Sequence, residues 1–210
     1  MMPPANLYLS RIQWLPYLDS EECQAVGVDN AEHFLSSLNN GTLELDDCHN
    51  LSPQKRYALK LALTAGDWLP RVESMPLPQP TAPGLFEINI PDPHTPVLVS
   101  GNSQLTLTVL TAVLATTISP FYLLLIDCRG DTVDMAMVYE TFTPVRLERG
   151  LKESDLAARI DHRQLVIPGL CASLQEPLAA QTGWQIQIGP ICAAELPLFF
   201  GERWLPPLDV

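Results

Sequence analysis

Residues 96–127 read PVLVSGNSQLTLTVLTAVLATTISPFYLLLID, and this stretch decides the fold class. No Asp, Glu, Lys or Arg occurs between Asp92 and Asp127. Ser119-Pro120 divides the apolar run into a helix-length part and a strand-length part, and each is shorter than the ~20 apolar residues that a transmembrane helix requires. We therefore expect no membrane span, but a helix and a central strand buried inside an α/β domain.

The pattern alternates between strand and helix on both sides of this stretch. Thr143-Pro144 begins a helix that we expect to run to about residue 160, with Thr143 as N-cap and Pro144 at the first helical position. The other expected elements are strands at 96–100, 121–127, 165–167 and 184–188, and helices at 103–116, 171–180 and 191–200. This alternation predicts a Rossmann-like α/β domain, a mostly parallel sheet with helices on both faces. Ligands of such sheets bind at the carboxyl ends of the strands.

The first third of the chain has a different character. Residues 6–68 read as mainly helical, with Ser20-Glu21-Glu22 opening one helix and Asn39-Asn40-Gly41 ending another. Eight prolines then fall between Pro70 and Pro96, a density that favours extended chain. We therefore expect a small helical module at 1–69, a Pro-rich linker at 70–95 and the Rossmann-like domain at 96–204.

Composition limits the function classes. The chain has 210 residues, 47% of them hydrophobic, and a net charge of −12 from 24 acidic and 12 basic residues. A surface this acidic repels phosphate backbones, so we expect no nucleic-acid partner. The odd number of five cysteines argues against a disulfide framework, and the first residues lack the charged and apolar regions of a secretory signal. These features predict a reducing compartment, the cytoplasm.

Two motifs lie at the last two expected strands: HRQLVIPG at 162–169 and GWQIQIGP at 183–190, followed by AAELP at 193–197. In this order and spacing they resemble the C-terminal signature of the large (gamma) subunit family of corrinoid iron-sulfur proteins, from the CO dehydrogenase/acetyl-CoA synthase system. Residues 96–102 resemble that family's first strand and turn, so the resemblance spans about 84–201. The corrinoid protein of mercury methylation shares this domain. The resemblance implies a bound cobamide.

The N-terminal module resembles the family's four-cysteine [4Fe–4S] domain, but two of the four cysteines are absent. Aligned without gaps, Cys23 and Cys48 take the first and last ligand positions, while Val26 and Ala31 take the second and third. A [4Fe–4S] cluster normally needs four thiolates, so we expect none and interpret the two cysteines as remnants of a cluster site. The family's central barrel has no counterpart here, because the linker leads directly into the last domain.

In the resembled family, the segment after the second strand lies beside the lower face of the corrin ring, and the mercury-methylating relatives carry a cysteine there. Residues 130–143 align with this segment, and Met135 takes the cysteine position. A methionine supplies no thiolate, so cobalt–thiolate chemistry is not expected. Bulky side chains at 137–140 replace the family's small residues, so the ligand binds differently or not at all. On residue type alone, Met135 and Met137 are core-filling side chains.

The resemblance and the strand ends together predict ten residues that line the ring: Ser100, Gly101, Asn102, Thr106, Thr132, Met135, His162, Pro168, Gly169 and Gly189. Glycine after a strand serves either a tight turn or close approach of a ligand. His162 either hydrogen-bonds a corrin amide or fixes the turn before its strand. If Gly169 marks the crevice, Gly169→Val should block the ligand and leave the fold intact.

These expectations predict a corrinoid-binding, methyl-carrier-like protein of one-carbon metabolism, which works with a methyltransferase or an acetyl-CoA synthase-type partner. The cofactor would supply the reactive cobalt, so we expect no catalytic residue, no metal-ligating set, and at most a corrinoid-dependent methyl-transfer component. The alternative is a degenerate paralogue that has lost cluster and corrinoid and acts as a binding or assembly partner. The strand-end motifs would then serve the fold alone.

Overall fold

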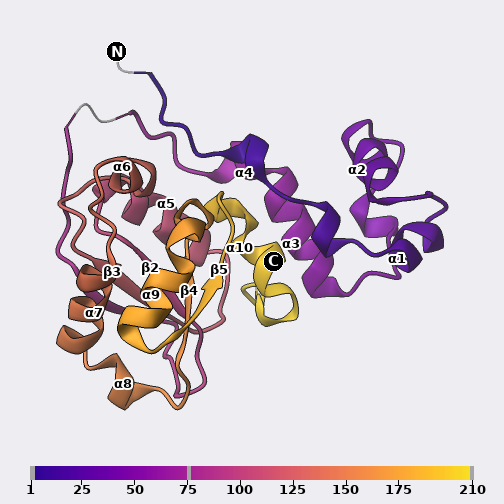
Figure 1. Ribbon diagram of the computed structural model, residues 1–210. Coiled ribbons are helices and arrows are strands. Elements are labelled where there is room, and N and C mark those ends of the chain that lie inside the picture. The colour runs from indigo at the N-terminus through magenta and orange to yellow at the C-terminus, as the bar shows by residue number, and fades with distance from the viewer. Residues whose placement is uncertain (1–2, 75–76, 209–210) are drawn as a thin grey trace.

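The computed structural model describes residues 3–74 and 77–208 (Figure 1). Its strands are β1 (Gly84–Ile88), β2 (Val97–Gly101), β3 (Phe121–Ile126), β4 (Gln164–Ile167) and β5 (Gln185–Ile188). Within the described residues they form one sheet in the order β1-β3-β2-β4-β5. Strands β2 to β5 run parallel, and β1 lies antiparallel to β3 at one edge. The predicted fold class, a Rossmann-like and mostly parallel α/β sheet, is confirmed.

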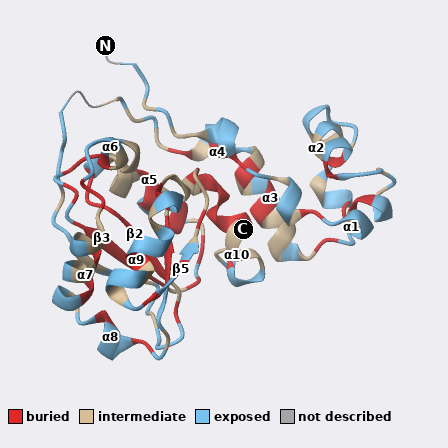
Figure 2. Cartoon of the chain, in the orientation of Figure 1, coloured by how far each residue is buried: buried red, intermediate tan, exposed pale blue. Residues whose placement is uncertain are grey.

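Every residue of β2 and β3 is buried, so these central strands have no solvent-facing side (Figure 2). Successive side chains of a strand point to opposite faces of the sheet. Leu98 and Leu123 accordingly belong to one cluster of buried side chains, and Val99 and Leu124 belong to another. The unbroken apolar sequence of these strands therefore reflects burial on both faces, as is usual for parallel sheets.

Helices cover both faces. The first face carries α5 (Gln104–Leu114) and α10 (Leu196–Phe200), and the second carries α6 (Val133–Val138), α7 (Pro144–Glu153), α8 (Leu156–Arg159) and α9 (Gln175–Thr182). The side chain of Thr143 accepts a hydrogen bond from the Arg146 backbone N and caps α7, as its sequence predicts. None of the helices described has the length and apolar character that crossing a bilayer requires.

Several expected helices are shorter or divided. α7 ends at Glu153 rather than near residue 160, because Asp155 adopts a left-handed φ of 50° that redirects the chain and lets Leu156 be buried in α8. The helix expected at 171–180 begins as a 3₁₀ helix, η4 (Gly169–Leu174), before α9. The helix expected at 191–200 likewise begins as η5 (Ala193–Glu195). The sequence pattern does not predict α6.

Residues 6–68 are mainly helical, as expected. The helices are α1 (Ser20–Ala25), α2 (Ala31–Asn39), α3 (Pro53–Leu63) and α4 (Ala65–Trp68), with 3₁₀ helices η1 (Leu9–Arg11), η2 (Leu15–Tyr17) and η3 (Leu45–Asp47); a further one, η6 (Gly201–Arg203), follows α10. Asp19 and Glu22 form a capping box at the start of α1. Gly41, at a φ of 69°, follows the end of α2.

The core of this helical module continues into the core of the sheet. α3 packs against α10, and the hydroxyl of Tyr57 in α3 donates a hydrogen bond to the Thr116 carbonyl after α5, at 2.7 Å. The ring of Phe121 in β3 packs against Phe200 and Trp204, with centroids 4.9 and 5.4 Å away. One cluster of buried side chains thus extends from the module through α10 to the sheet. That residues 1–69 form a unit of their own stays a prediction.

A buried glutamate also joins the module to the sheet domain. Glu195, in η5, is 2% exposed and accepts hydrogen bonds from the Tyr17 hydroxyl at 2.9 Å and the Gln13 backbone N at 3.0 Å. Burial raises the pKa of this carboxyl, and the two hydrogen bonds act in the opposite direction. Because a buried carboxyl without partners is costly, these two donors fix the position of the module's first turns.

The expected linker contains an unexpected strand, β1, at residues 84–88. A strand between prolines is tolerated here because β1 is an edge strand and needs hydrogen bonds on one side only. The preceding residues are docked as well: the Thr81 backbone N donates to the Asn102 carbonyl at 2.8 Å, and a side chain on Gly130 would collide with the backbone of residues 79–80. Residues 75 and 76 of the linker lie outside the described residues.

We predict that Gly130→Ala destabilises the protein by about 2–3 kcal/mol, because the added methyl meets both a φ of 81° and the backbone of residues 79–80. Gly183→Ala is the matched control. Gly183 has a similar φ of 70°, but nothing lies within 4 Å of an added Cβ. It should therefore cost only about 1 kcal/mol. Urea unfolding followed by tryptophan fluorescence measures both. Equal losses would show that residues 79–80 do not pack on Gly130.

Candidate functional site

A cavity of about 320 Å³ lies at the carboxyl edge of the sheet, where β2 and β4 end. From β2 the chain continues to β3 on one side, and it reaches β4 on the other side, so the order of the strands reverses between β2 and β4. The helices that follow such neighbouring strands lie on opposite faces, and a crevice opens between them. This reversal point is the usual ligand site of open α/β sheets.

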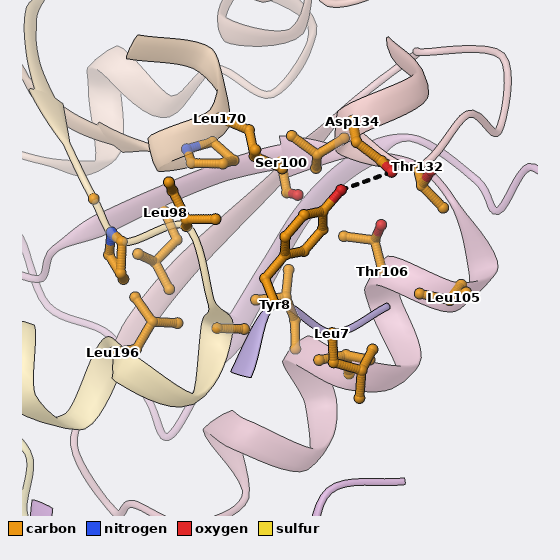
Figure 3. A pocket seen from close by; sticks show the side chains of 18 of the residues that line it. Leu7, Tyr8, Leu98, Ser100, Leu105, Thr106, Thr132, Asp134, Leu170 and Leu196 are labelled. Carbon is orange, nitrogen blue, oxygen red and sulfur yellow. Dashed lines mark hydrogen bonds between the residues drawn. The ribbon is translucent and has the colours of Figure 1, made fainter. Parts of the chain in front are cut away.

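Six of the ten residues predicted from the sequence line this crevice: Ser100, Thr106, Thr132, Met135, Pro168 and Gly189. Apolar side chains supply most of the remaining wall, among them Leu98, Val109, Leu123, Val166 and Leu196. The hydroxyls of Ser100, Thr106 and Thr132 stand within this apolar lining (Figure 3). Few polar groups in an apolar wall suit an organic ligand.

The N-terminal segment supplies another part of the wall, which the sequence reasoning missed. Residues 5–8 line the crevice, and the hydroxyl of Tyr8 donates a hydrogen bond to Asp134 Oδ2 at 2.9 Å (Figure 3). Burial and the neighbouring carboxylate raise the pKa of Tyr8 to about 12. Burial opposes ionisation of Asp134, but hydrogen bonds from Thr132 and Tyr8 outweigh it and lower its pKa. At neutral pH a neutral phenol thus donates to an ionised carboxylate.

Gly169 and Gly189, at the ends of β4 and β5, are explained by packing within the protein. A Cβ on Gly169 would lie 2.8 Å from the Gly189 carbonyl O and 2.8 Å from the Ile191 backbone N. A Cβ on Gly189 would lie 2.8 Å from Val166 Cγ1. Gly169 is not among the residues that line the crevice. The expectation that Gly169→Val leaves the fold intact is therefore wrong, because the larger side chain meets backbone on both sides.

Asn102 is a scaffold residue beside the crevice and does not line it. Its side-chain oxygen accepts hydrogen bonds from the backbone N of Cys128 at 2.8 Å and of Gly130 at 3.2 Å, and its amide N donates to the Thr81 carbonyl at 2.8 Å. One buried side chain thus joins the ends of β2 and β3 to the docked linker. Its neighbour Gly101 also lies behind the lining, where a Cβ would be 3.3 Å from Cys128 Sγ.

His162 lies at the amino end of β4, at the sheet edge opposite the crevice. Its Nδ1 accepts a hydrogen bond from the Gln164 backbone N at 3.2 Å, so its Nε2 donates to the Thr95 carbonyl, 3.0 Å away. These contacts fix the turn into β4. The second interpretation of His162, that it fixes the turn before its strand, therefore accounts for its position. His162 takes no part in the site proposed below.

Cys23 and Cys48 are both completely buried within the helical module, in α1 and directly after η3. Burial raises the pKa of both thiols. Val26 follows α1 and Ala31 begins α2. Across residues 3–74 and 77–208, no three His, Cys, Asp or Glu side chains are grouped so that they could hold a metal ion. The absence of an iron-sulfur cluster stays a prediction.

Comparison with known proteins places this architecture in a family. Residues 74–199 match the family model for the CO dehydrogenase/acetyl-CoA synthase delta subunit, which covers more than half of the chain. The chain belongs to this family. The match begins just before β1 and ends within α10, so it contains the whole sheet and the strand ends that form the crevice.

Similar curated proteins carry related names. The acetyl-CoA decarbonylase/synthase complex subunit gamma of Methanopyrus kandleri is 35% identical over 128 residues, 61% of this chain and 28% of that protein. Its counterpart in Archaeoglobus fulgidus is 30% identical over 129 residues, 61% of this chain and 27% of that protein. The corrinoid/iron-sulfur protein large subunit of Moorella thermoacetica is 31% identical over 106 residues, 50% of this chain and 24% of that protein.

The predicted relationship to the corrinoid protein of the CO dehydrogenase/acetyl-CoA synthase system is confirmed at the level of the family. The matched part amounts to about a quarter of the length of these curated relatives. The family model is named for the delta subunit and the relatives for gamma or large subunits. The activity and partners of those longer proteins are therefore taken up below as proposals.

We predict that Asn102→Ala costs about 2–3 kcal/mol of folding stability, because it leaves two buried backbone N–H groups and one carbonyl without their partner. Ser103→Ala is the matched control, since the Ser103 hydroxyl is buried and has no hydrogen-bond partner in the described part of the chain. Its removal should be neutral or slightly stabilising. Thermal unfolding compares the two variants, and a comparable loss in both would contradict the scaffold role of Asn102.

Proposed function

We propose that this chain is a corrinoid-binding, methyl-carrier-like protein of one-carbon metabolism that works with the enzymes of a CO dehydrogenase/acetyl-CoA synthase-type complex. The observation that carries the proposal is the position of the crevice. It lies at the reversal point of the sheet, its lining belongs to the family-matched segment except for residues 5–8, and six residues predicted from the corrinoid resemblance line it. The complexes named for the relatives support a partner of the same kind.

The lining supports an organic macrocycle with polar arms. In this proposal the hydroxyls of Ser100, Thr106 and Thr132 hydrogen-bond amide side chains of the corrin, and the apolar wall contacts the ring. The cobamide, when bound, supplies a cobalt that accepts and releases a methyl group. Met135, 37% exposed at the rim, offers a thioether rather than a thiolate to this space. In this proposal, the residues of the protein bind the cobamide, orient it and shield it from solvent.

One further feature is consistent with this setting. All five cysteines are free and buried, which supports a reducing compartment, the cytoplasm. Because the cofactor would supply the reactive cobalt, we propose no catalytic residue and at most the role of a component in corrinoid-dependent methyl transfer.

The glycines at the strand ends favour a second candidate, a degenerate paralogue without corrinoid that acts as a binding or assembly partner. Gly169 and Gly189 are each needed where backbone and side chains of the protein itself approach within 3 Å. Their motifs would therefore persist in a relative that keeps the fold and binds no cofactor. The two candidates differ in one measurable property, the affinity for a corrinoid.

We predict that hydroxocobalamin, added to the purified protein, changes its absorption spectrum and raises the melting temperature of the protein. A ligand at a hundred times its Kd that binds only the folded state stabilises it by about 2.7 kcal/mol. Thr106→Phe should weaken this binding about tenfold or more, because the ring fills the crevice from α5. The matched control is Thr111→Phe on the same helix, where position 111 is exposed and outside the lining.

The controls separate the two candidates. If hydroxocobalamin changes neither its absorption spectrum nor the melting temperature of the wild-type protein, the corrinoid proposal fails. The degenerate paralogue is then the remaining candidate. If Thr106→Phe and Thr111→Phe bind alike, corrinoid binds elsewhere than in this crevice. Circular dichroism of both variants establishes that the α/β fold is retained.

A further inference from the structure

The N-terminal segment is held on one side by a short backbone pairing. The Ala5 backbone N donates to the Val72 carbonyl, and the Ser74 backbone N donates to the Pro3 carbonyl, each at 2.8 Å. An isolated antiparallel bridge joins Pro4 and Glu73 between them. The segment at 3–5 is thus fixed to residues 72–74 at the start of the linker.

From this pairing the chain crosses onto the crevice. Tyr8 has a left-handed φ of 59°, and its backbone N is held by Asn6 Oδ1 at 2.9 Å. The Tyr8 ring enters the space between α5 and α6, where its hydroxyl meets Asp134 (Figure 3). At the preceding residue, the Leu7 carbonyl accepts a hydrogen bond from the thiol of Cys192, at 3.1 Å. Residues 5–8 therefore lie over the strand ends as a cover.

The cavity is small for the proposed ligand. Pockets that bury a drug-sized molecule measure roughly 300–1,000 Å³. The cavity beneath the cover measures about 320 Å³, at the lower end of that range. A corrin with its amide arms is larger than a drug-sized molecule. With Tyr8 in place, the crevice is thus smaller than a corrin with its amide arms.

We propose that residues 5–8 form a movable cover, latched by the hydrogen bond between Tyr8 and Asp134, which must open before a corrin-sized ligand enters the crevice. This inference rests on the proposed function, because the cavity is compared with the size of the proposed ligand, but the labelling experiment below tests the movement of the cover without that ligand. The cover lies outside the family-matched residues 74–199, and its partner Asp134 lies inside them. The latch therefore joins a segment outside the family match to a residue inside it.

The side-chain contacts suit a cover that opens. Toward the crevice, the described hydrogen bonds of residues 5–8 are the Tyr8 hydroxyl to Asp134 and the Cys192 thiol to the Leu7 carbonyl. Tyr8 itself is only partly buried. Loss of the Tyr8 hydroxyl removes a hydrogen bond to an ionised carboxylate, the stronger kind of side-chain hydrogen bond, and leaves the apolar contacts of the ring in place. Tyr8→Phe therefore changes the latch and little else.

Chemical labelling of Cys192 can measure the opening of the cover in the absence of a ligand. Its side chain is 1% exposed, and burial raises the pKa of its thiol. Opening of the cover removes the carbonyl that lies against this sulfur, so the rate at which N-ethylmaleimide labels Cys192 should follow the open fraction. Cys171 belongs to the buried cluster on the other face of the sheet, and its labelling measures global unfolding. Peptide mass spectrometry distinguishes the two sites.

The experiment compares the wild-type protein, Tyr8→Phe and the matched control Tyr139→Phe. Tyr139 is 60% exposed at the end of α6, close to the crevice. We expect Tyr8→Phe to raise the labelling of Cys192 relative to Cys171 roughly three- to tenfold. It should also accelerate the binding of hydroxocobalamin, measured by stopped-flow absorption. Tyr139→Phe should change neither rate.

The outcomes separate the cover from the ligand. Equal labelling of Cys192 in the two variants would overturn the latch. Faster labelling in Tyr8→Phe, with hydroxocobalamin bound by none of the proteins, would support the movable cover and defeat the corrinoid proposal. Faster labelling combined with identical hydroxocobalamin binding in the wild-type protein and Tyr8→Phe would show that the cover moves but does not control entry.

Discussion

Burial of β2 and β3 on both faces is the constraint on which the rest of this structure depends. A parallel sheet with two apolar faces must be covered on both. The second face receives α6 to α9, which follow β3 and β4 along the chain. The first face receives α5 and the short α10, and the core then extends into α3 of the helical module. The module is therefore a part of the same hydrophobic core as the sheet, in addition to any role of its own.

The same topology creates the crevice. Helices that leave β2 and β4 toward opposite faces cannot also fill the space above the strand ends, so an opening between β2 and β4 is a direct result of the strand order. The residues around it divide by role. Asn102, Gly169 and Gly189 hold the edge together through contacts inside the protein. The hydroxyls of Ser100 and Thr106 remain directed at the cavity. Only the hydroxyls that face the cavity indicate what kind of ligand could bind there.

Local sequence signals predicted the central strands and the cap at Thr143 well, because uncharged β-rich runs and capping residues act over a few neighbouring positions. The same reasoning missed β1, since its neighbouring prolines read as linker while its pairing with β3 is a contact between distant residues. His162 was placed at the ligand although it precedes a strand, and residues before a parallel strand lie at the edge opposite the crevice. The contact between Tyr8 and Asp134 joins positions 126 residues apart, and no local pattern indicates it.

The family-matched segment begins at residue 74, but the hydrophobic core does not. A fragment that starts there would keep every strand and still expose the side of α10 against which α3 packs. Aggregation would then be the expected behaviour of the isolated domain, since exposed apolar patches of this kind seek another surface. In a longer protein, the neighbour of this domain must therefore supply an apolar surface that covers α10. The border of the sequence similarity and the border of the hydrophobic core lie at different places in this chain.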